Sequence, residues 1–277
     1  MTLRLITAIA VLVFSAESCS LKEDRKACPC MLTVYFGNAS DSDGEAILTV
    51  SPAQSGRDVL LSGGQGFLIQ ESIFPSDYQY GYSEEVPRTH ITVSAIQGLK
   101  NSTLSGNNVI IADGSDSDRL FIYSETIDCQ CENASATARL HKGWASLEIS
   151  TGNYGELSGR LEITVSGNIN GIDVLSGKPA EGKFECRARL FDEDFGTYEL
   201  NLPRQISGKR DLFIKMTDIS EGKELLHCCL SDILENAGYD WDKENLDDIR
   251  LDFDQIDCSF TVRICDWESG TDGPVVI

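Results

Sequence analysis

The chain is poor in positive charge. Its 277 residues include 23 lysines and arginines against 44 aspartates and glutamates, which gives a formal net charge of −21. A surface of this sign repels phosphate backbones, so nucleic acid is excluded as an expected partner. After residue 18 no apolar run approaches the roughly 20 residues that a transmembrane helix needs. A membrane location would therefore depend on an attached lipid.

Sequence motifs of enzymes are also absent. The chain has no Gly-x-Ser-x-Gly elbow, no His-Glu-x-x-His pair and no phosphate-binding loop. The glycine-rich segment 62–66 lacks the Lys-Ser/Thr of such a loop, so we interpret it as a turn. No pattern places a nucleophile and an orienting acid beside one of the three histidines. We expect a protein that is not an enzyme and that holds no cofactor and no metal.

The first 18 residues are typical of a secretory signal. Arg4 supplies a positive charge, residues 5–14 form a short apolar run, and small residues precede Cys19. Cys19 stands where a lipoprotein carries its lipid, although Glu17 is charged where that motif prefers a small residue. The alternative is a secreted protein cut near Ala16, with Cys19 an ordinary thiol. Either interpretation predicts export.

The chain has ten cysteines, which are many for a reducing cytosol and natural for an oxidising compartment. Four of them form two Cys-x-Cys pairs, Cys28 with Cys30 and Cys129 with Cys131. Residues i and i+2 of a strand share a face, so each pair points one way. The two pairs could form two disulfides, remain free thiols or hold a zinc ion. Export favours disulfides, but the pairing does not follow from sequence.

Short strand-forming runs, separated by turn residues, occupy most of the mature chain. This pattern predicts an all-β protein with antiparallel sheets of sandwich or barrel type. A boundary is expected near 133–138, between two series of strands. The expected strands are 31–36, 46–50, 59–62, 67–70, 90–96, 109–112 and 120–127, then 144–150, 157–166, 184–190, 212–217, 249–253 and 258–264.

One helix is expected, at about 221–236. Its apolar residues recur at helical spacing, with Ser220 as a possible N-cap and Gly238 as a stop. His227 and Cys228 lie in this segment without a spaced partner pair, so we interpret them as an exposed helix face rather than a metal site.

Two further patterns leave alternatives open. The acidic segments 41–45 and 113–118 resemble pieces of calcium loops without the spacing of an EF-hand, so solvated turns are favoured over calcium sites. Tyr78, Tyr80 and Tyr82 alternate, which would place them on one face of an extended strand. They would then form either an aromatic platform for a sugar or a loop packed on the sandwich.

Several local patterns, taken in order, resemble one family. The segments concerned are Cys19-Ser20 with 22–25 and 28–30, 139–142 leading into 144–150, 180–184, 238–241, 246–249 and 266–268. By these segments the chain is similar to the fimbrillin-A-associated anchor proteins, which are fimbrial subunits of Bacteroidales-type pili. The extra cysteines Cys228, Cys229, Cys258 and Cys265 are not part of this pattern.

The resemblance implies two tandem transthyretin-like antiparallel β-sandwich domains, with one amphipathic helix in the second. The expected order is a signal peptide (1–18), a lipidated tether (19–27), an N-terminal sandwich (28–134) and a C-terminal sandwich (135–277). The family role is structural: a lipid-bearing (palmitate) cysteine, here Cys19, anchors or terminates a fimbria at the outer membrane, exposed at the cell surface. The expected partner is a fimbrial stalk subunit, joined by strand addition.

Strand addition directs attention to both ends of the mature chain. Met31, Val34 and Phe36 belong to the first expected strand, which related stalk subunits lose to a trypsin-like protease. No lysine or arginine occurs between residues 37 and 56, and Arg25 and Lys26 precede the strand. We therefore expect the first strand to stay in its own domain. The tail residues Val275, Val276 and Ile277 are strand formers and could be donated.

Two other functions remain open. One is a minor or tip fimbrial adhesin. The other is a surface lipoprotein that binds glycans.

Overall fold

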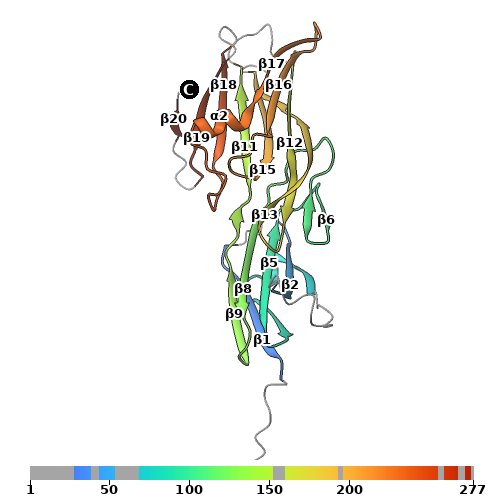
Figure 1. Cartoon of the computed structure of the whole chain (residues 1–277). Coiled ribbons are helices and arrows are strands. Elements are labelled where there is room, and N and C mark those ends of the chain that lie inside the picture. Colours follow the sequence, from blue (N-terminus) through green and yellow to red (C-terminus); the bar gives the residue numbers. More distant parts are fainter. Residues whose placement is uncertain are drawn as a thin grey trace, which may run out of the picture.

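The structure is a computed structural model that describes residues 28–38, 44–53, 69–151, 160–192, 196–254, 259–267 and 272–275. Two β-sandwiches lie end to end, with β1 in the lower one and β17 to β20 in the upper one (Figure 1). The predicted all-β class is confirmed, and within the described ranges α2 is the one α-helix. No helix in these ranges is both long enough and apolar enough to cross a membrane.

The N-terminal sandwich packs a three-stranded sheet on a five-stranded sheet. Leu32, Val34, Leu48, Ile91 and Val93 are among the buried residues between them. The first sheet has the order β4 (Tyr82–Val86), β1 (Cys30–Phe36), β9 (Asn133–Ala138). The second has the order β10 (His141–Lys142), β8 (Phe121–Asp128), β5 (His90–Gln97), β2 (Ala46–Pro52), β3 (Ile69–Ile73), and a short 3-10 helix, η4 (Pro75–Asp77), follows β3.

The C-terminal sandwich is larger. One sheet has the order β14 (Arg189–Asp192), β15 (Thr197–Pro203), β11 (Trp144–Ser150), β18 (Asp248–Asp254), β19 (Ser259–Cys265), β20 (Asp272–Val275). The other has the order β17 (Lys223–Cys229), β16 (Phe213–Asp218), β12 (Leu161–Asp173), β7 (Asn108–Ile110), β6 (Thr103–Ser105), and β13 (Lys178–Arg187) also pairs with β12. Apolar side chains from both sheets and from α2 (Leu230–Asn236) form its core.

The hairpin β6–β7 links the two sandwiches. It precedes β8 in the chain, yet β7 pairs with β12 of the C-terminal sandwich, with Ile110 opposite Gly171. A Cβ atom on Gly171 would lie 2.0 Å from the carbonyl oxygen of Val109, so this crossing needs a glycine. A small buried cluster that includes Ile96, Val109 and Ile172 fills the space between the sandwiches.

The helix predicted over 221–236 is only half present. Residues Lys223–Cys229 form strand β17, and the helix is confined to Leu230–Asn236. Strand β17 pairs along β16 and satisfies backbone groups of β16 that would otherwise lie at the sheet edge. This pairing overrides the helical spacing of the apolar residues. The predicted stop is confirmed, since Gly238 has φ +81° and donates its N–H to the carbonyl of Glu235.

The proposed division between residues 134 and 135 falls inside β9. All of Asn133–Ala138 belongs to this strand, and its pairing with β1 covers the whole segment. The division into domains at this position stays a prediction. The expected strand 59–62 lies outside the described residues.

Candidate functional site

Strand β1 occupies the centre of its sheet. It pairs antiparallel with β4 and parallel with β9, and the parallel register runs from Met31 opposite Asn133 to Phe36 opposite Ala138. Its buried and exposed residues alternate, as expected for a strand with one face on a core. The chain's own first strand therefore fills the position between β4 and β9.

The predicted strand-exchange residues of β1 differ in their surroundings. Val34 is fully buried in the core. Phe36 is half-buried, and its ring lies 5.1 Å from that of Tyr78. Met31 is 38% exposed on the outer face. The inward-facing side chains thus anchor β1 to the five-stranded sheet as well as to its neighbours. Whether any of these residues takes part in strand exchange stays a prediction.

Three of the four Cys-x-Cys cysteines meet at the start of β1. The thiol of Cys30 is in hydrogen-bond contact with the thiols of Cys129 and Cys131. Cys30 and Cys129 are buried, whereas Cys28 and Cys131 are exposed. All four are free thiols in the structure. In the part of the chain that the structure describes, no three His, Cys, Asp or Glu side chains are placed to hold a metal ion.

The remaining predicted site residues lie at the two ends of the chain. Cys19, Val276 and Ile277 fall outside the described residues. Val275 ends β20, which pairs antiparallel with β19 of the same chain. Donation of the tail to a neighbour would require β20 to leave this ladder, and it stays a prediction.

An ion pair between a buried lysine and a partly exposed aspartate joins the two sandwiches. Lys142 belongs to β10 of the N-terminal sandwich and is fully buried, and its Nζ lies 2.5 Å from Oδ1 of Asp248 in β18. The same Nζ donates to the carbonyl of Leu246 at 3.1 Å and lies over the rings of Trp144 and Trp267. Burial lowers the pKa of Lys142, while its bond to Asp248 opposes this shift.

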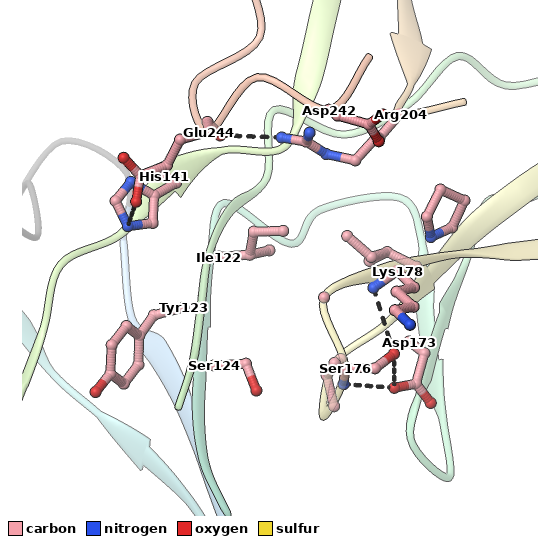
Figure 2. A pocket seen from close by; sticks show the side chains of 14 residues that line it. Ile122, Tyr123, Ser124, His141, Asp173, Ser176, Lys178, Arg204, Asp242 and Glu244 are labelled. Atoms are coloured by element: carbon pink, nitrogen blue, oxygen red, sulfur yellow. Dashed lines mark hydrogen bonds and ion pairs between the residues drawn. The ribbon is translucent and has the colours of Figure 1, made fainter. Parts of the chain in front are cut away.

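Beside this junction is an open cleft of about 280 Å³. Figure 2 shows its walls, which come from β8, β10, the β12–β13 hairpin and the segments after β15 and before β18. Polar groups of the walls bind one another: Nε2 of His141 lies 3.0 Å from Glu244, and Asp173 accepts from the backbone N–H and the hydroxyl of Ser176. Arg204 donates to the carbonyls of three residues between 241 and 244. Of these contacts, the one between His141 and Glu244 joins the two sandwiches, and the others lie within the C-terminal sandwich.

The hypothesis that Tyr78, Tyr80 and Tyr82 form an aromatic platform for a sugar is wrong. The segment is not an extended strand, because η4 and a turn precede β4. Tyr78 is buried and donates its hydroxyl to the carbonyl of Gly44 at 2.6 Å. Tyr80 is 72% exposed, and Tyr82 lies in β4 with its hydroxyl near Glu84. The three rings therefore share no face.

The acidic segment 113–118 serves the structure as a set of hydrogen-bond acceptors. Asp118 accepts from the backbone N–H groups of 100–102, and Asp116 accepts from the backbone and side chain of Asn201. Burial by itself raises the pKa of Asp118, but the backbone hydrogen bonds outweigh it and the pKa is lowered. The other acidic segment considered for calcium, 41–45, lies mostly outside the described residues.

Sequence patterns did not mark Lys142 as a buried charge. Its partner Asp248 comes 106 positions later, so no local spacing connects them. The path of β6–β7 was missed for the same reason, because its partner strand β12 is far away in sequence.

Comparison with known proteins places the fold. No family model matches the sequence, and no curated protein matches it. Among solved structures, the fimbrial anchor protein Mfa2 of Porphyromonas gingivalis is similar at TM-score 0.56 and 13% identity, over 90% of this chain and 99% of Mfa2. A candidate polysaccharide-binding protein of Bacteroides thetaiotaomicron gives TM-score 0.60 and 11% identity over 89% and 98%. A candidate adhesin of Bacteroides ovatus gives 0.59 and 10% over 90% and 96%.

These structures share the two-sandwich fold over nearly their whole length. The resemblance to fimbrial anchor subunits is thus confirmed at the level of fold.

Proposed function

We propose that this chain is a structural lipoprotein, not an enzyme, that anchors or terminates a fimbria at the outer membrane. Cys19 carries the lipid, residues 20–27 form the tether, and strand addition joins the folded part to a stalk subunit. Two acyl chains on one cysteine would hold the protein stably, where a single chain gives only marginal binding.

The central position of β1 carries this proposal. Strand addition needs an open groove in the acceptor, where main-chain groups wait for a donor strand. Here β4 and β9 already pair with β1 on both sides. No lysine or arginine occurs between residues 37 and 56, so a trypsin-like protease has no site directly after β1. A subunit that keeps its first strand accepts no donor there, which suits the end of a polymer.

The fold of Mfa2 adds support, because that protein is a fimbrial anchor with the same two-sandwich arrangement. Two contacts between the sandwiches also suit a protein under tension. The ion pair Lys142–Asp248 and the pairing of β7 with β12 each connect one sandwich to the other.

The test is to shear fimbriated cells that carry the wild-type chain or Cys19→Ala, and to blot cells and medium. We expect wild-type cells to retain their fimbriae and Cys19→Ala cells to shed long fimbriae with this protein attached. Cys28→Ser is the matched control, since it removes a nearby cysteine but leaves the lipid site. If the fimbriae stay on Cys19→Ala cells while only this protein is lost from the membrane, the anchor function is wrong.

Mass spectrometry of the protein in purified fimbriae tests the retained strand. We expect its N-terminus to lie before residue 30. A mature protein that starts anywhere from residue 37 to residue 58, the latter after a cut at Arg57, has lost β1 and contradicts the proposal. Labelling by antibody then separates an anchor at the base from an adhesin at the tip.

One observation favours glycan binding as a second candidate function. Trp267 is 44% exposed at the mouth of an open hollow of about 500 Å³, where it lies near Phe121 and Arg119. An exposed aromatic ring beside a cation is suited to stack on a sugar ring. A glycan array with the wild-type chain and Trp267→Ala tests this function. Glycan binding that survives the substitution would exclude this hollow as the sugar-binding site.

A further inference from the structure

The thiols at the start of β1 bring together two segments that are distant in sequence. Cys30 is the first residue of β1, and Cys129 and Cys131 lie between β8 and β9. The backbone holds these segments together: Met31 donates its N–H to the carbonyl of Glu132 at 2.8 Å, and Cys129 donates its N–H to the carbonyl of Thr89 at 3.0 Å. The contact between the thiols is therefore a consequence of the strand ladder.

Burial distinguishes one pair within this group. Cys30 and Cys129 are both fully buried, and their thiols are in mutual hydrogen-bond contact. Cys131 is exposed, and its thiol lies 2.9 Å from the carbonyl of Asn133. A disulfide between Cys30 and Cys129 would be closed to solvent, whereas one through Cys131 would not.

We propose that Cys30 and Cys129 form a disulfide in the exported protein, and that this bond fixes β1 to the turn between β8 and β9. Two S–H bonds break and one S–S bond forms. The two electrons and two protons pass to a disulfide-bearing oxidoreductase in the compartment to which the chain is exported, and its disulfide becomes two thiols. Both sulfurs then lie in the core, out of reach of soluble reductants.

The surroundings indicate when the bond forms. Burial raises the pKa of both thiols, that of Cys129 to about 12, so the folded protein holds them protonated. Thiol exchange needs a thiolate, so oxidation belongs to the folding stage, before β1 is fully packed. Arg88 lies near Cys30 and opposes the effect of burial, and its buried Nε and Nη2 atoms have no hydrogen-bond partner.

The position of the bond gives it a mechanical role, which rests on the proposed anchor function. Tension on an anchored fimbria enters the fold through the residue at which the tether joins β1. Without the bond, only non-covalent contacts resist the removal of β1: its hydrogen bonds to β4 and β9 and the packing of its buried side chains. With the bond, the load passes from Cys30 into the segment that connects β8 to β9. The strand that closes the groove then cannot be pulled out.

Peptide mapping without reduction tests the bond. Trypsin yields one peptide of residues 27–57, with Cys28 and Cys30, and one of residues 120–139, with Cys129 and Cys131. The full-length double variant Cys28→Ser/Cys131→Ser changes only exposed positions and leaves the buried pair as the sole possible link between them. We expect the two peptides to be joined, lighter by two hydrogen atoms than their sum. Two separate peptides from this variant would overturn the proposal.

Shearing of cells tests the mechanical role. We expect Cys129→Ala cells to shed fimbriae at a shear that wild-type and Cys131→Ala cells withstand. Equal retention by the Cys129→Ala and Cys131→Ala cells would overturn the mechanical role. The peptide map does not depend on the anchor function, so its result and the Cys19→Ala result can fail independently.

Discussion

β1 and β11 hold the same position in the two sandwiches. In the N-terminal sandwich, β1 has β4 as an antiparallel neighbour and β9 as a parallel one. In the C-terminal sandwich, β11 has β15 as an antiparallel neighbour and β18 as a parallel one. Both strands bury alternate side chains, and Leu32 and Leu147 are the corresponding buried leucines.

The support around these strands differs. β4 and β9 are edge strands of a three-stranded sheet, whereas β15 and β18 are themselves flanked by β14 and β19. β1 precedes every other strand, so one cut after it frees it from the chain. β11 follows β10 after the single residue Gly143 and cannot be freed in this way. A single cut could therefore release the strand at this position in the N-terminal sandwich but not in the C-terminal one.

The largest effect is expected from truncating the two matching leucines. Leu32→Ala and Leu147→Ala each leave a cavity in one core, which costs about 3 kcal/mol of unfolding free energy. Of the three tryptophans, Trp241 lies in the C-terminal core, whereas Trp144 and Trp267 lie at the junction beside Lys142, so tryptophan fluorescence reports the C-terminal sandwich together with the junction. In urea titrations we expect Leu147→Ala to move the fluorescence transition. Leu32→Ala should move an earlier transition seen by circular dichroism.

The two cores do not unfold separately if Leu32→Ala moves the fluorescence transition as far as Leu147→Ala does. The ion pair Lys142–Asp248 and the shared cluster around Val109 would then couple the sandwiches into one unfolding unit.

A smaller effect is expected at the strand crossing that the two sandwiches share. In Gly171→Ala the new methyl group meets the carbonyl of Val109, so β7 must leave β12 or shift, at a cost of about 2 kcal/mol. Hydrogen exchange should increase in β6 and β7 more than in the rest of the N-terminal half. Gly143→Ala is the control, because there the methyl group meets the flexible end of Ile122. Equal exchange in both variants would show that the crossing does not depend on Gly171.

Local sequence patterns predicted most strands, because alternation and turn residues are local signals. The segments of β1, β5, β8 and β11 agree with the structure to within one residue at most ends. Strand β9 was missed as a strand. Its sequence NASATA is small and polar enough to suggest a boundary, and it becomes a strand through its parallel partner β1. Because the partner strand lies 102 positions away, the local sequence of β9 does not indicate the pairing.

The candidate site was predictable only in part. The Cys-x-Cys spacing indicated two thiol pairs on strand faces, but only the fold shows that Cys30 meets Cys129 at the start of β1. The tyrosine motif failed because Pro75 begins a 3-10 helix and Gly81 adopts φ +73°, which breaks the extended conformation that the alternation assumed. Spacing predicts faces only where the backbone stays regular.

The smallest effect is expected from Asp118, which holds the turn before the β6–β7 hairpin. Asp118 is 5% exposed and holds the turn that leads into β6 through the N–H groups of 100–102. Its pKa is lowered in the folded state, because these bonds outweigh the opposing effect of burial. A carboxyl with a lowered folded pKa stabilises the protein above its unfolded pKa of about 3.9, and this stability is lost as the pH falls through the folded pKa.

Asp118→Asn should therefore cost about 1.5 kcal/mol at pH 7, the usual contribution of hydrogen bonds to a charged group. The difference from wild type should begin to shrink below about pH 4, where the carboxyl of the unfolded wild-type chain becomes protonated, and it should be lost as the pH falls through the lower folded pKa. Asp113→Asn removes the same charge from an exposed position in the same acidic segment and should show no such pH dependence. Urea titrations at pH 7 and pH 3 measure both variants. If Asp118→Asn loses the same unfolding free energy at both pH values, the carboxylate charge of Asp118 does not hold the turn.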